Sequence, residues 1–171
     1  MADFSLTYRI IIIELLDRAS APLSNAMICD FTAETDLMDY FATQQTINDL
    51  IDAGMITSEA SATSTQYHVT EQGKETLRLY RSEVPARIRE SIKSFLKNNK
   101  VSIQYDSSLS ADYHPSPEGG YLCSLRRLEE GQVIISLLLH VSSESAAEAA
   151  CVNWRSLNEE LYSVILDNLI R

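Results

Sequence analysis

The spacing of hydrophobic residues over the first third of the chain predicts three consecutive helices. Phe4 to Ala19 is apolar on more than one helical face, which indicates a helix buried on two sides. Ser24 can cap a short second helix. A third helix is expected between Thr43 as its cap and Gly54 as the residue that ends it. Its apolar positions fall on one face and its polar positions on the other, as in an amphipathic helix.

A hairpin and a fourth helix are predicted next. Strand patterns at Met55–Thr57 and Gln66–Thr70 flank a tip rich in serine, threonine and alanine. Thr70 can then cap a helix over Glu71–Arg81. The order helix, helix, helix, hairpin, helix is typical of a winged helix-turn-helix.

The second half of the chain predicts a helix, three strands and a final helix. Pro85 opens a helix that runs to about Asn98. A tight turn is expected at Glu130–Gly131, and the last helix begins with the capping-box pattern Ser145-x-x-Glu148. The strand-like runs are Val101–Tyr105, Tyr121–Leu128 and Val133–Val141.

Together these elements predict an α+β protein with three parts. Residues 1–82 form the winged helix-turn-helix, residues 83–100 a basic connecting helix, and residues 101–171 an α+β domain with a small three-stranded antiparallel sheet and a long C-terminal helix. The run Val133–Val141 is almost continuously apolar, so it needs cover on both faces, and one helix covers only one of them. The second cover must be the winged domain or another subunit. With the two-sided first helix, this favours a homodimer.

Composition places the chain in a soluble, cytoplasmic setting. The net charge of −10 opposes unaided binding to DNA or to an anionic membrane. The start of the chain lacks the basic segment of a signal peptide, and the apolar run Ile10–Ile13 is far too short to span a bilayer. The three cysteines are scattered and odd in number, which favours reduced thiols over a disulfide framework.

The distribution of charge along the chain is uneven. Ala19 to Gly73 holds eight carboxylates and no lysine or arginine, whereas Lys74 to Lys100 holds eight bases and three carboxylates. From Val101 onward the balance is acidic again, with ten carboxylates and four arginines. The predicted third helix therefore lies in the part of the chain that has no positive charge.

Several motifs resemble a bacterial winged-helix family catalogued as domain of unknown function 4364. The first runs from Tyr40-Phe41-x-x-Gln44-Gln45 through Ile47 and Leu50 to Gly54-x-Ile56. The others are Tyr67-x-Val69-Thr70-x-x-Gly73-x-x-x-Leu77 and the pair Asn153-Trp154. The resemblance spans nearly the whole chain and implies a winged helix, a small α+β tail and a role in transcription. It implies no ligand, reaction or catalytic residue.

A DNA-reading role would place polar side chains of the third helix against base edges. Glutamine and asparagine can form paired hydrogen bonds with adenine in the major groove. The alternative is that these residues are solvated positions on an amphipathic helix. The candidates for base contact are Thr43, Gln44, Gln45 and Asn48.

Contacts with DNA phosphates would have to come from the basic block. Asp49 and Asp52 would repel the DNA backbone, and phosphate neutralisation supplies most non-specific affinity. Arg89, Lys93, Lys97 and Lys100 are spaced by four, four and three residues and form a basic stripe on one helix. The alternative is that this stripe is an ordinary solvated helix face. The candidates for phosphate contact are Lys74, Arg78, Arg89, Lys93, Lys97 and Lys100.

Catalytic and metal-binding chemistry is poorly supported. The three histidines have no ligand spacing with one another or with the cysteines, although Cys123 and His140 lie on neighbouring predicted strands. Asp112-Tyr113-His114 could line a small-molecule pocket, but a polar loop explains it as well. We therefore expect no enzyme, no cofactor and no metal site.

Two functional hypotheses follow from the sequence. In the first, the chain is a homodimeric winged-helix transcriptional regulator that binds double-stranded DNA, and the tail serves dimerisation or the sensing of an effector. In the second, the winged helix is a protein-interaction module, and the polar face of its third helix meets a basic partner instead of DNA.

Overall fold

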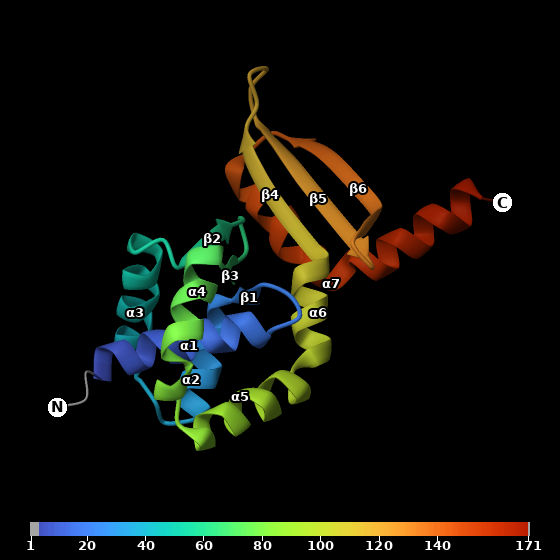
Figure 1. Ribbon diagram of the computed structural model, residues 1–171. Coiled ribbons are helices and arrows are strands. Elements are labelled where there is room, and N and C mark those ends of the chain that lie inside the picture. The colour runs from blue at the N-terminus through green and yellow to red at the C-terminus, as the bar shows by residue number, and fades with distance from the viewer. Residues whose placement is uncertain (1–3, 171) are drawn as a thin grey trace. The chain divides into compact units, whose positions relative to one another are not determined.

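The computed structural model describes residues 4–170, which form two compact units (Figure 1). The first unit holds the described residues up to Ala60 together with Thr65–Ser107. The second holds Ser61–Ser64 and the described residues from Ser108 onward. Residues 1–3 and 171, which the predicted parts 1–82 and 101–171 include, lie outside the described residues.

The first unit combines helices with a small antiparallel sheet of strand order β1-β3-β2. Its chain order follows the predicted series of helix, helix, helix, hairpin and helix, and adds a two-residue strand before the second helix. The elements are α1 (Phe4–Arg18), β1 (Leu23–Ser24), α2 (Asn25–Glu34), α3 (Tyr40–Asp52), β2 (Ile56–Ala60), β3 (Thr65–Val69), α4 (Glu71–Tyr80), the 3₁₀ turn η1 (Arg81–Glu83), α5 (Ala86–Asn98) and α6 (Lys100–Ser108).

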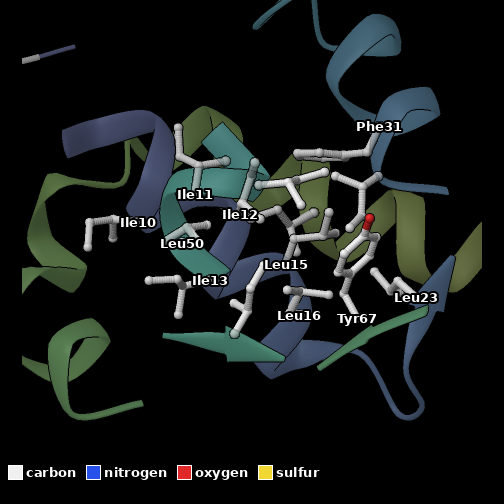
Figure 2. Close-up of a cluster of buried hydrophobic side chains, with 14 of the residues drawn as sticks. Ile10, Ile11, Ile12, Ile13, Leu15, Leu16, Leu23, Phe31, Leu50 and Tyr67 are labelled. Atoms are coloured by element: carbon white, nitrogen blue, oxygen red, sulfur yellow. The ribbon is translucent and has the colours of Figure 1, made fainter. Parts of the chain in front are cut away.

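Helix α1 is the centre of the first core, as its two-sided apolar pattern predicts. Four consecutive side chains from Ile10 to Ile13 are fully buried, and Leu15 is buried beside them (Figure 2). Phe31 of α2 and Phe95 of α5 meet edge to face in the same core, with ring centroids 5.4 Å apart. Helices α3 and α5 lie on different sides of α1 (Figure 1).

Several local signals in the sequence are confirmed. The Ser24 side chain accepts a hydrogen bond from the Met27 amide and caps α2, and Thr70 caps α4 through the Gly73 amide. Gly54 has φ +68° and ends α3, with the Met55 amide bonded to the Leu50 carbonyl. This is the left-handed termination that glycine allows without steric cost.

The expected cap of α3 at Thr43 is wrong. The helix begins one turn earlier, because the Asp39 carboxylate accepts a hydrogen bond from the Ala42 amide and supplies the cap. Thr43 is fully buried in the first turn, where its hydroxyl bonds to the Asp39 carbonyl. Asp39 satisfies the free amides at the helix start, so Tyr40 and Phe41 become helical residues.

The second unit is an antiparallel sheet of order β4-β5-β6 with one long helix on one face. Glu130 and Gly131 both have positive φ, 50° and 79°, and form the predicted two-residue turn between β5 and β6. Trp154 of α7 is buried, and its indole nitrogen donates to the Arg126 carbonyl, 3.0 Å away. The elements are β4 (Leu109–Pro115), β5 (Tyr121–Glu129), β6 (Gln132–Val141) and α7 (Glu144–Leu169).

Two further expectations are corrected. Val101–Tyr105 is not a strand but part of α6, because Ile103 packs into the core of the first unit and its amide bonds to the Asn99 carbonyl. The first strand of the second sheet starts later, at Leu109. The capping box at Ser145 is also wrong, since Ser143 is extended and its hydroxyl caps α7 through the Ala146 amide. The described residues thus form an α+β fold with seven α-helices and two three-stranded antiparallel sheets.

The close approach of α4 to the turn after α3 gives a test of the first core. A Cβ atom at Gly73 would lie 2.1 Å from the Met55 carbonyl oxygen and 2.8 Å from a Val69 methyl group. We expect Gly73→Ala to lower the free energy of unfolding by about 1–3 kcal/mol, the usual cost of overpacking. Denaturant unfolding measures this change. Glu75→Ala on the exposed side of α4 is the control and should stay within about 0.5 kcal/mol of the parent. Equal stability of the two variants would contradict this packing.

Candidate interaction face on the third helix

The outward side of α3 carries a single line of side chains. Thr43, Thr46, Ile47 and Leu50 face the core. Four residues on the other side, spaced by four, three and four positions, fall along one line of an α-helix and are all exposed. We call this line the ridge; it consists of Phe41, Gln45, Asn48 and Asp52.

The ridge begins with exposed aromatic side chains. Phe41 is 82% exposed and its neighbour Tyr40 is 59% exposed. Their rings meet edge to face with centroids 5.8 Å apart, so each ring supports the other on the surface. Aromatic residues are enriched in protein–protein interfaces, where they often act as anchors. The start of α3 therefore offers an apolar contact point that its own unit does not cover.

Only two of the four candidates for base contact point away from the protein. The Thr43 hydroxyl is buried and lies 2.9 Å from that of Thr32. Gln44 is half-buried, and its amide donates to Asn25 Oδ1 and Cys29 Sγ of α2, 3.0 and 3.4 Å away. Gln45 and Asn48 are exposed on the ridge.

The ridge is surrounded by carboxylates, and its nearest cation is already paired. Arg9 of α1 reaches α3 and donates to Asp49 Oδ2 at 2.6 Å. Hydrogen bonds from Gln45 and from Arg9 hold the pKa of Asp49 below its ordinary value. Among the described residues, the exposed carboxylates Asp39 and Asp52 form no ion pair with any base. The face is therefore acidic.

The candidates for phosphate contact lie elsewhere in the first unit and fall into two groups. On α4, Lys74 pairs with Glu71 at 2.9 Å and Arg78 pairs with Glu75 at 3.5 Å. The hydrogen bond and charge of Glu71 raise the pKa of Lys74, and those of Lys74 lower the pKa of Glu71. The second group, on α5 and at the start of α6, is free of ion pairs in the described structure; it comprises Arg89, Lys93, Lys97 and Lys100.

The fold does not bring the two sets of DNA-contact candidates together. The base-contact set belongs to α3, whereas the unpaired cations belong to α5 and α6, and α3 and α5 pack on different sides of α1 (Figure 1). Groove reading needs phosphate neutralisation beside the inserted helix. Within the first unit, the geometry leaves the ridge without this support.

The sequence did not reveal two features of this face, the exposure of Phe41 and the Arg9–Asp49 ion pair. A cap at Thr43 puts Phe41 before the helix, whereas the observed cap at Asp39 makes Phe41 a helical residue on the outward side. The signal was available, since Asp39 is also a preferred capping residue. The Arg9–Asp49 pair joins residues forty positions apart, so no local sequence pattern predicts it.

The structure separates Cys123 from His140, the cysteine and histidine that lie on neighbouring strands. Cys123 faces α7, whereas His140 pairs with Leu122, the neighbouring position of the strand, and so lies on the opposite face of the sheet. Burial raises the pKa of Cys123, and burial together with Cys123 raises the pKa of Cys151 to about 11. Thiols of this kind are poor nucleophiles. Among the described residues, no three histidine, cysteine or acidic side chains are grouped to hold a metal ion.

Comparison with known proteins identifies the family. The chain belongs to the family described as "Domain of unknown function (DUF4364)", which matches residues 8–169. No curated protein and no solved structure matches the chain. In the part of the chain that the structure describes, no helix has both the length and the apolar character needed to cross a membrane.

The hydrogen bonds to Asp49 give a prediction about its titration. Gln45→Ala removes the first cause of the depressed pKa, so the pKa of Asp49 should rise toward the ordinary aspartate value. Carboxyl chemical shifts followed by NMR across a pH titration measure it. Because the folded pKa is depressed, the contribution of the Arg9–Asp49 pair to stability is present above the unfolded pKa and is lost as the pH falls through the folded one. Gln44→Ala is the control, and an equal rise in that variant would contradict the assignment.

Proposed function

We propose that the first unit is a winged helix-turn-helix used as a protein-interaction module, with the ridge of α3 as its docking face. The support for the winged helix is the order of elements, with β2 and β3 forming the hairpin after α3 and β1 adding the third strand. The support for protein docking is the chemistry of the ridge, which combines an exposed phenylalanine with uncompensated carboxylates.

Electrostatics favours a basic partner over a duplex at this face. Duplex DNA carries one negative charge per about 1.7 Å of helix axis, and binding depends on cations that replace its counterions. The hairpin that follows α3 holds Glu59 and no lysine or arginine, and Arg9 is engaged by Asp49. A duplex on the ridge would meet carboxylates without compensation. A lysine- or arginine-bearing protein surface would meet complementary charge.

The partner's surface can be described further from the ridge. Phe41 requires a small apolar pocket, because a largely exposed ring gains most from burial at the centre of an interface. Asp52 ends the ridge three helical turns later and requires a base at about 16 Å from that pocket, from the helical rise of 1.5 Å per residue. Gln45 and Asn48 lie between them and supply hydrogen-bonding groups.

Paired variants test the docking face. The wild-type protein and the variant Phe41→Ala with Asp52→Lys are used as baits in extracts of the producing cells, followed by binding measurements with the purified partner. We expect the wild type to capture a basic protein and the variant to bind it at least about 30-fold more weakly, the ratio expected for loss of a hot-spot residue. Isothermal titration calorimetry gives the two dissociation constants.

The control variant makes the same two kinds of change on another helix, the reversal of one carboxylate and the truncation of one exposed apolar side chain. Glu75→Lys with Leu79→Ala on α4 reverses an exposed carboxylate and removes an apolar side chain that is 76% exposed, and it should bind like the wild type. Equal losses in both variants would argue against a specific role of the ridge. If the ridge variant instead loses binding to duplex DNA that the wild type retains, the ridge is a DNA-reading face and the regulator hypothesis replaces this proposal.

We also propose that the second unit forms a homodimer. Helix α7 buries Ala147, Cys151, Trp154 and Asn158 along one side of its first fifteen residues. Its last ten residues are apolar on several sides, and a helix with this character is normally buried on more than one side. The exposed large apolar side chains from residue 157 onward are Leu157, Leu161, Val164 and Leu169, with Ile170 just beyond the helix. An exposed apolar patch of this kind marks an association surface.

Substitutions on α7 test self-association. We expect the wild type to sediment at twice the 19.2 kDa mass of one chain, and Leu161→Lys with Val164→Lys to sediment at the mass of one chain. Two charges placed within an apolar interface would each lose hydration without a partner. Analytical ultracentrifugation measures both masses. Val101→Lys, at an exposed apolar position of the first unit, should leave the dimer intact. A monomeric wild type at high protein concentration would refute the proposal.

A further inference from the structure

Within the first unit, the cations of α5 and α6 differ from the other described bases in how they are compensated; in the second unit, Arg126 of β5 also has no ion pair. Carboxylates outnumber lysines and arginines in this chain by 24 to 14, so partners for ion pairs are abundant. In the described structure, Arg9, Arg18, Lys74, Arg78, Arg81 and Arg127 all pair with a carboxylate. Five consecutive bases of α5 and α6 pair with none. We call them the cation track; they are Arg87, Arg89, Lys93, Lys97 and Lys100.

The cation track is held on a rigid support. Ile88, Ile92 and Phe95 are buried in the core of the first unit and fix one side of α5. Arg89, Lys93 and Lys97 recur every four residues on the other side, about 6 Å apart along the helix axis. The thirteen residues of α5 span about 20 Å. Glu90 is the single carboxylate on α5, and Glu83 lies just before it in η1.

We propose that the cation track binds the phosphate backbone of duplex nucleic acid, without reading its sequence. Phosphate contacts need cations and small neutral donors, and exposed Ser94 and Asn98 lie among the cations. The base-reading candidates Gln45 and Asn48 lie on α3 and not on α5, so the contacts proposed for the track are with the backbone. This surface is separate from the ridge and does not depend on the protein partner proposed for it.

The surroundings of the track exclude other anionic partners in turn. None of the large apolar side chains exposed on the described structure belongs to α5, and Val101 beside Lys100 is the single one in α6, so an acidic protein would find no anchor along Arg87–Lys97. Single-stranded nucleic acid needs aromatic side chains for base stacking, and the exposed side of α5 has none. An anionic membrane needs an apolar helix face to insert, and that of α5 is buried in the core.

The net charge of the chain determines how such binding behaves. A protein of net charge −10 is repelled by a polyanion at long range, so binding depends on the local track and on low salt. Contacts with about four phosphates predict that the logarithm of the association constant falls with the logarithm of salt concentration with a slope of about −4.

The experiment measures binding of a fluorescent random-sequence 20-base-pair DNA duplex by anisotropy from low to physiological salt. We expect salt-dependent binding by the wild type. Lys93→Gln with Lys97→Gln should weaken binding at least about tenfold at low salt. The slope of the logarithm of the association constant against the logarithm of salt concentration should change from about −4 to about −2. The matched control is Lys74→Gln with Arg78→Gln, which removes the same charge from cations that are already paired, and it should change binding less than about twofold.

Further arms separate this proposal from its alternatives. The variant Phe41→Ala with Asp52→Lys should bind the duplex, and adding Lys93→Gln and Lys97→Gln to it should weaken that binding as it does in the wild type. A failure of the ridge proposal is then distinguishable from a failure of this one. Equal weakening by the two glutamine pairs would show that only net charge matters and would overturn the track. Absence of duplex binding at low salt, or tighter binding of polyglutamate or of a single strand than of the duplex, would also overturn it.

Discussion

The first unit depends on the burial of one helix. Helix α1 contacts α3, α4, α5, η1 and β3, and its four consecutive isoleucines lie entirely inside the core. Each fully buried side chain of this size contributes about 1.5–3 kcal/mol, so the central helix supplies a large share of the hydrophobic stabilisation. Glu14 is buried in the same helix, where Arg18 and Arg81 compensate its charge. Because breaking a buried ion pair is strongly destabilising, this contact also fixes η1 against α1.

Because α1 lies between α3 and α5, these two helices are on different sides of it. Helix α3 uses its inner face on one side of α1, and α5 uses its inner face on another, so their outer faces point in different directions. The exposed face of α3 carries carboxylates and exposed aromatics, whereas α5 carries four unpaired cations and one carboxylate, Glu90. Two different partners, one basic and one anionic, follow from this arrangement more readily than one duplex bound by both helices. In this proposal the first unit joins a protein to a nucleic acid.

The ion pairs sharpen the contrast between the two faces. Arg9 compensates Asp49 at the edge of the ridge, and the bases of α4 are compensated by carboxylates one helical turn away. Such exposed pairs add little to stability, but they cancel charge that a ligand would otherwise meet. The charge without an ion pair is acidic on α3 and mainly basic on α5, where Glu90 is the single carboxylate. The second unit adds a third surface of a different kind, the apolar end of α7.

The sequence by itself determined the elements whose signals are local. Helix periodicity, the caps at Ser24 and Thr70, the left-handed Gly54 and the Glu130–Gly131 turn all depend on a few adjacent residues, and each is present in the structure. The family was also recognisable, because its motifs are runs of sequence.

Tertiary structure alone decided the features that depend on distant residues. The run Val101–Tyr105 is strand-like in its local pattern, but packing of Ile103 on the first core selected a helix. The burial of Thr43 and Gln44 against α2, the Arg9–Asp49 pair and the separation of α3 from α5 likewise arise from contacts across the fold. Local sequence sets which side of a helix is apolar. Tertiary packing sets which helices lie next to one another. It therefore decides which charged side chains are exposed together on one surface of the protein.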